Sequence, residues 1–194
     1  MPKYAPPAAL LLLALATGFV GCDGSSPSSP PTATGADGAA NQATGKTEIV
    51  DIWTPAAVGD DALLRKRLAT AGVNPDELDP TFGATAIALA ADFGRTEAVR
   101  ILLDAGADPN ALNKNGSSPA LGAAFFGRPE CLRILLEAGA DPTIADEEGT
   151  TTFTALDVPW PITKMIADAL QMPLDPELLD TGRDACRAIL SERR

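Results

Sequence analysis

The chain has 194 residues, enough for one domain or for one domain with a tail. Its formal net charge of −11 argues against nucleic acid and anionic lipid as partners, because both attract clusters of Lys and Arg. The sequence contains no His, which removes His-dependent catalysis and the commonest zinc ligand. We therefore expect no enzyme, no metal, no cofactor and no nucleic-acid partner; the acidity favours a solvated surface over a specific basic partner.

Residues 1–21 are typical of an export signal. Lys3 precedes an apolar run from Ala8 to Val20, which is too short for a bilayer of roughly 30 Å but suits the core of a signal peptide. The run ends in Phe-Val-Gly followed by Cys22, which resembles the lipobox of bacterial lipoproteins. That resemblance implies an acylated Cys22 as the mature N-terminus and a lipid anchor in a membrane. The alternative is an ordinary secretory signal that is cleaved nearby, leaving a soluble periplasmic or secreted protein.

The segment that follows, residues 23–46, has the composition of a flexible spacer. It contains no aromatic residue and no Leu, Ile or Val, and is rich in Ser, Pro, Gly and Ala. Such a segment cannot bury enough apolar surface to offset its chain entropy. We therefore expect a lipidated Cys and linker over residues 22–46 and a folded domain over residues 47–194.

The folded region repeats itself every 33 residues. Residues 94–109 and 127–142 agree at 12 of 16 aligned positions. A fixed period of this size indicates stacked units that bury their apolar faces against one another. Within one unit, the Ala-rich segment after Thr85 predicts a short helix, and Gly94 predicts a turn. A second helix is predicted over 95–105, and an extended excursion follows it.

This order of helix, turn, helix and extended finger resembles the ankyrin repeat. Residues 83–148 carry the Leu-Leu and Gly-Ala-Asp-Pro signatures of that family. The resemblance implies an all-α ankyrin-repeat solenoid of about four repeats including the caps, and protein recognition as its function. Polar Arg65, Lys66 and Arg67 on the first unit suit an N-terminal cap, whose outer face meets water. The expected units are residues 50–82, 83–115, 116–148 and 149–194.

The last unit departs from the period. Residues 154–158 resemble a first helix displaced by three residues, and the next Gly-Arg pair stands at 182–183. We interpret this unit as a repeat split by an insertion over 159–180. The alternative is that 162–172 is the second helix and 183–193 an unrelated cap.

Cysteines 131 and 186 occupy equivalent positions in successive units. Stacked equivalents should lie about one repeat apart, beyond the reach of a disulfide, which needs Cα atoms within about 7 Å. We therefore expect both as small buried core residues.

The predicted interaction surface is the concave face of the solenoid. Phe93 and Phe126 are expected to stack side by side there, at the ends of the two first helices; the alternative is that these rings pack as core beneath the fingers. Truncation would separate the two, because a buried Phe contributes roughly 3–5 kcal/mol to stability and an exposed one about 0.5 kcal/mol. The candidate site residues are Asp92, Phe93, Asn113, Lys114, Asn115, Phe125, Phe126, Glu147 and Glu148.

The function predicted from these features is an exported, membrane-anchored protein-interaction module of the bacterial envelope, acting as a monomer on an unidentified protein partner. One alternative is a periplasmic inhibitor or immunity-type protein. The other is a carboxylate-based enzyme with its site on the 159–180 insertion, which the absence of His and of any nucleophile–base pair disfavours.

Overall fold

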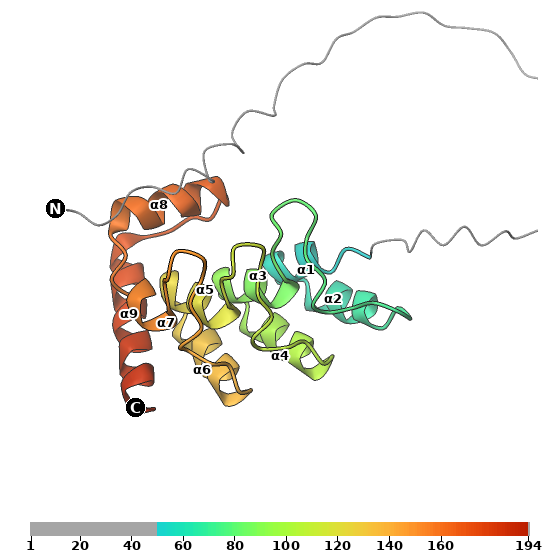
Figure 1. Cartoon of the computed structure of the whole chain (residues 1–194). Coiled ribbons are helices and arrows are strands. Elements are labelled where there is room, and N and C mark those ends of the chain that lie inside the picture. Colours follow the sequence, from blue (N-terminus) through green and yellow to red (C-terminus); the bar gives the residue numbers. More distant parts are fainter. Residues whose placement is uncertain (1–49, 194) are drawn as a thin grey trace, which may run out of the picture. The chain divides into compact units, whose positions relative to one another are not determined.

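A computed structural model describes residues 50–193, which are helical with short connecting loops (Figure 1). Residues 1–49, and with them the predicted signal, Cys22 and nearly all of the linker, lie outside the described residues. The helices are α1 (Trp53–Val58), α2 (Asp61–Leu68), α3 (Ala86–Asp92), α4 (Thr96–Asp104), α5 (Pro119–Phe125), α6 (Pro129–Glu137), α7 (Thr152–Ala155), α8 (Trp160–Ala169) and α9 (Pro176–Ser191).

The helices stack in two rows. The first helices of the repeats pack in the order α1, α3, α5 and α7, and the second helices pack in the order α2, α4, α6 and α9. Small side chains allow the first row to approach closely, because an Ala holds the neighbouring backbone away by only one methyl group. Six fully buried alanines lie in α3 and α5: Ala86, Ala90, Ala91, Ala120, Ala123 and Ala124.

A hydroxyl side chain begins each of the last three first helices. Thr85, Ser118 and Thr151 each accept a hydrogen bond from the backbone N–H three residues on, at 3.2, 3.2 and 3.4 Å. This is the usual N-cap contact, which satisfies a donor that the helix itself cannot. The three caps follow the 33-residue period, so α7 begins in register. The expectation of a first helix displaced by three residues is therefore wrong; α7 is in place but short.

One arginine per repeat ties each second helix to the preceding repeat. Arg95 Nε donates to the Ala57 carbonyl at 3.0 Å, and Arg128 Nε donates to the Asp92 carbonyl at 3.1 Å. Arg183 Nε makes the same contact with the Phe125 carbonyl at 3.1 Å. Each acceptor lies two residues before the turn glycine of its repeat.

The arginine contacts show how the last repeat is built. Arg183 occupies the place of Arg95 and Arg128, and α9 packs on α6 as the second helix. Residues 162–172 are not that second helix; they belong to α8 and the turn after it, between α7 and α9. α9 begins at Pro176, where Asp175 caps it, so the last residues of the expected insertion 159–180 form the first turn of α9.

The last repeat also lacks the glycine turn of its predecessors. Gly94 and Gly127 have φ of 70° and 62°, whereas Gly182 lies inside α9 in helical conformation. Its Cα faces the backbone of Gly127 across the repeat interface. A Cβ at Gly182 would lie 2.9 Å from the Gly127 carbonyl carbon, and closer still to its oxygen. The two glycines therefore set how closely α9 approaches the third repeat.

This contact predicts that Gly182→Ala destabilises the fold. A Gly-to-Ala change inside a helix normally adds about 1 kcal/mol of stability. Here the new methyl group meets main-chain atoms that cannot turn away, so we expect a net loss of about 2 kcal/mol. Urea unfolding measures the change, with exposed Thr181→Ala as the control, expected within about 0.5 kcal/mol of the parent. A neutral or stabilising Gly182→Ala would show that the two backbones are not in contact.

Candidate interaction surfaces

The aromatic residues at the ends of α3 and α5 lie beneath the insertion. Phe126 is 4% exposed, and Phe93 and Phe125 are half-buried. The rings of Phe125 and Phe126 form an edge-to-face pair with centroids 4.8 Å apart. The three rings share one apolar cluster with five side chains of the insertion: Ile166, Ala167, Leu170, Met172 and Leu174. The expectation of Phe126 as an exposed ring is therefore wrong, because residues from α8 and the segment after it cover it.

Arg183 holds the insertion to the third repeat. One terminal nitrogen of its guanidinium donates to the Val158 carbonyl at 2.6 Å, and the other donates to Thr163 Oγ1 at 2.9 Å. The second nitrogen also reaches the Phe125 carbonyl at 2.7 Å, and the guanidinium lies 5.5 Å from the centre of the Phe125 ring. Burial lowers the pKa of this guanidinium from its usual value.

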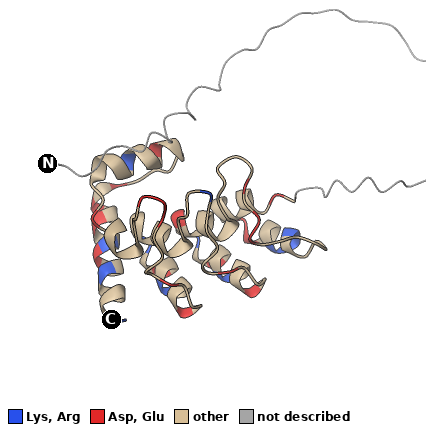
Figure 2. Cartoon of the chain, in the orientation of Figure 1, with Lys and Arg blue, Asp and Glu red and all other residues tan. Residues whose placement is uncertain are grey.

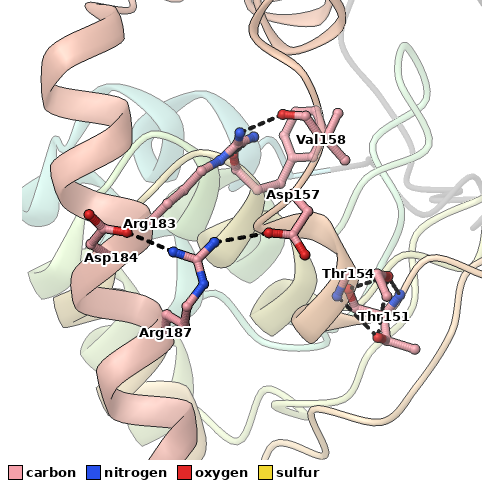
Figure 3. Close-up of polar contacts among 8 residues, drawn as sticks. Thr151, Thr154, Asp157, Val158, Arg183, Asp184 and Arg187 are labelled. Atoms are coloured by element: carbon pink, nitrogen blue, oxygen red, sulfur yellow. Dashed lines mark hydrogen bonds and ion pairs between the residues drawn. The ribbon is translucent and has the colours of Figure 1, made fainter.

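Figure 3 shows Arg183 extending from α9 toward the Val158 carbonyl, with Arg187 beside it. Arg187 makes ion pairs with Asp157 at 3.0 Å and with Asp184 at 2.6 Å. These two pairs are exposed, and pairs of that kind contribute at most about 1 kcal/mol. The buried Arg183 contacts are therefore the principal polar link between α9 and the insertion.

The finger loops are joined to one another through the main chain. The Lys114 N–H donates to the Gly83 carbonyl at 2.7 Å, and the Glu147 N–H donates to the Asn115 carbonyl at 3.2 Å. Of the finger residues predicted for the site, Lys114, Asn115, Glu147 and Glu148 are exposed. Asn113 is half-buried, and its side chain accepts from the Ser117 N–H at 2.8 Å to close its finger.

The family comparison agrees with this geometry. Residues 56–146 match the family model described as ankyrin repeats (3 copies). The fold is an ankyrin-repeat solenoid. The prediction of an all-α solenoid is thereby confirmed, and ankyrin repeats suggest a protein-interaction module. The match ends at residue 146, before the repeat that the insertion divides. No curated protein matches the chain.

Three exposed apolar side chains on the ankyrin fingers were missed by the sequence argument. Leu78, Phe82 and Leu112 are 41%, 50% and 45% exposed. Leu78 and Leu112 are equivalent, because each precedes the residue whose N–H closes its finger, Asp79 on Ala84 and Asn113 on Ser117. The signal was present in the sequence as a Leu just before a turn-forming Asp or Asn in two successive fingers.

Glu77 and Asp79 flank Leu78, and Figure 2 shows acidic positions along the finger before α7. Lys114 is the basic residue of the middle finger. We call this exposed set the finger row; its members are Leu78, Phe82, Leu112, Lys114, Asn115, Glu147 and Glu148.

Residues 50–193 contain neither a candidate metal site nor a candidate membrane-spanning helix. No group of three or more His, Cys, Asp or Glu in this range could hold a metal ion. None of the helices in it is long and apolar enough to cross a membrane. Cys131 and Cys186 are both buried free thiols, as expected from their positions.

Asp92, predicted for the binding face, carries a buried carboxyl group. Its Oδ1 has no hydrogen-bond partner and lies against Gly122 of α5, where any Cβ would collide with it. Burial raises the pKa of this carboxyl to about 7, and the nearby Arg128 offsets the rise only in part. The carboxyl is therefore a constituent of the packing between α3 and α5.

The raised pKa predicts that stability depends on pH through Asp92. The folded state keeps a proton that the unfolded chain loses, so stability falls as pH rises from 3.8 to about 7 and stays low above it. A rise of about three pKa units corresponds to at most about 4 kcal/mol. Asp92→Asn should therefore be more stable than the parent at about pH 8 and similar at about pH 4 in urea unfolding. Exposed Glu148→Gln serves as the control, and parallel curves for Asp92→Asn and the parent would contradict this assignment.

Proposed function

We propose that this chain is an exported, lipid-anchored interaction module of a bacterial envelope, and that its finger row binds a protein partner. The observation that carries the proposal is the exposure of Leu78 and Leu112 at the same position of neighbouring fingers, together with that of Phe82 on the first of these fingers. Burying the exposed half of one such side chain in an interface contributes about 1 kcal/mol. A row of three is enough to anchor a specific contact, as interface hot spots commonly do.

The charge around the finger row selects the partner. Glu147 and Glu148 extend it with exposed carboxylates, and the chain as a whole carries a net charge of −11. Complementary charge speeds encounter and disfavours acidic competitors. The partner that fits is a protein surface with an apolar centre and a basic rim.

The anchor part of the proposal rests on the sequence alone. Acylation of Cys22 would tether the solenoid through residues 23–46. A flexible chain of that length has a root-mean-square span of roughly 30 Å, which lets a monomeric solenoid sample partners near a membrane without lying on it. The acidic surface would itself be repelled by anionic lipid.

Partner capture tests the finger row. We expect the double variant Phe82→Ser and Leu112→Ser to lose at least about tenfold of the crosslinked partner recovered from native envelopes, because each ring or branched side chain is a hot-spot candidate. Leu178→Ser makes the same apolar-to-polar change at an exposed residue of α9 and is the control. Equal recovery for the double variant and the control would exclude the finger row as the binding surface.

The anchor has its own test. Mass spectrometry of the mature N-terminal peptide should find Cys22 carrying acyl chains, with residues 1–21 removed. Cys22→Ser should move the protein from the membrane fraction to the soluble fraction, because the anchor supplies the membrane affinity. An unmodified N-terminus at another residue would instead indicate a soluble exported protein.

A further inference from the structure

The apolar side chains of the insertion form a cluster of their own. Phe126, Ala167 and Met172 are its buried members, and Phe93 and Phe125 pack both on this cluster and on the main core between the stacked helices. The backbones of neighbouring stacked helices lie close together along their lengths. The backbone of α8 does not lie as close to that of any other described helix. In Figure 1, α8 lies across the end of α9 instead of continuing either row. The insertion is thus attached through side chains alone over most of its length.

Few polar contacts hold the insertion down. Thr163 accepts from Arg183, and the Met172 sulfur lies 3.6 Å from a terminal nitrogen of Arg128. Both arginines also bond main-chain carbonyls of the repeats, Arg183 that of Phe125 and Arg128 that of Asp92. Lifting the insertion would therefore leave each guanidinium with its partner in the solenoid.

The insertion contains one residue in a strained backbone conformation, near its C-terminal end. Pro159 and Pro161 stand at the N-cap and in the first turn of α8, where proline suits the start of a helix. On the other side, Gln171 has φ of 53°, the one positive value at a non-glycine residue between 50 and 193. A left-handed conformation at such a residue costs about 1–2 kcal/mol and persists only where surrounding contacts impose it.

The face that α8 turns toward the repeats is that of an amphipathic ligand. Ile166, Ala167 and Leu170 belong to the apolar cluster that contains Phe126, whereas Lys164, Met165 and Asp168 are exposed. Spacings of three and four residues place the inward side chains on one stripe of the helix. Binding of an amphipathic helix in an apolar groove is a common mode of peptide recognition, in which the groove contacts such an apolar stripe.

We propose that residues 160–174 are a displaceable lid, a built-in occupant of the groove formed by Phe93, Phe125 and Phe126. When the lid lifts, the groove accepts an amphipathic helix of a partner protein with a similar apolar stripe. The lid thereby regulates a second contact surface beside the finger row. This regulatory role rests on the proposed interaction function, whereas the opening of the lid is a property of the chain alone.

Hydrogen exchange on the full chain tests the opening. Amides of residues 162–170 should exchange through a local opening that is insensitive to low urea, at least about tenfold faster than amides of α5 and α6. If these amides instead exchange only by global unfolding, together with α5 and α6, the insertion is fixed core and the proposal is overturned.

A variant pair tests the occupancy of the groove. The probe is a fluorescent synthetic peptide of residues 160–174, followed by anisotropy. Leu170→Ser weakens the lid, so the variant should bind the peptide at least about tenfold more tightly than the parent does. Met165→Ser, at an exposed residue of the same helix, should behave like the parent. Adding Phe93→Ser to Leu170→Ser should abolish the binding.

The outcomes separate this proposal from the proposed function. Failure of Leu170→Ser to bind the peptide, with its global unfolding midpoint lowered, would overturn the lid and leave partner capture by the finger row unaffected. A working lid in a protein that captures no partner would instead remove the interaction role and keep the conformational device.

Discussion

The structure depends on one hydrogen bond made three times: an arginine, which is the N-cap of α4 and of α6 and lies within α9, donates to a carbonyl near the end of the first helix of the preceding repeat. The acceptor is main chain, so the residue that supplies it is free to vary. Ala57, Asp92 and Phe125 occupy this position in successive repeats. A charged donor makes the bond stronger than an amide would. The register of neighbouring repeats is thereby fixed by main-chain acceptors, and the side chains of the acceptor residues can differ from repeat to repeat.

This arrangement explains how the last repeat tolerates an interruption. The caps that start the first helices and the arginines that orient the second helices act independently of each other. Residues between them can loop out, provided that Thr151 and Arg183 both keep their places. The cost appears at Gly182, where a helix replaces a turn and the backbone of α9 comes close to Gly127. Two glycines in contact permit an approach that any larger residue would prevent.

The repeats could be predicted from sequence because their determinants are local and periodic: glycines with positive φ, hydroxyl caps and apolar second helices. The start of α7 could also have been found, since Thr151 follows Ser118 by 33 residues. The burial of Phe126 could not, because it depends on Ala167 and Met172 packing from a segment that follows no repeat pattern. The exposure of Leu78 and Leu112 was missed for the opposite reason. The two leucines stand among charged and polar finger residues, so no apolar periodicity marks them.

Exposed apolar surface promotes self-association, and the structure limits it differently at the three aromatic rings and at the finger row. A contiguous row of three aromatic rings left in water would favour self-association. The insertion removes that row from solvent without adding bulk to the fingers. The finger row exposes apolar residues singly, each bordered by carboxylates or polar groups, and so keeps the solubility that a net charge of −11 provides. The solenoid thereby keeps the finger row exposed and the three aromatic rings covered by the insertion.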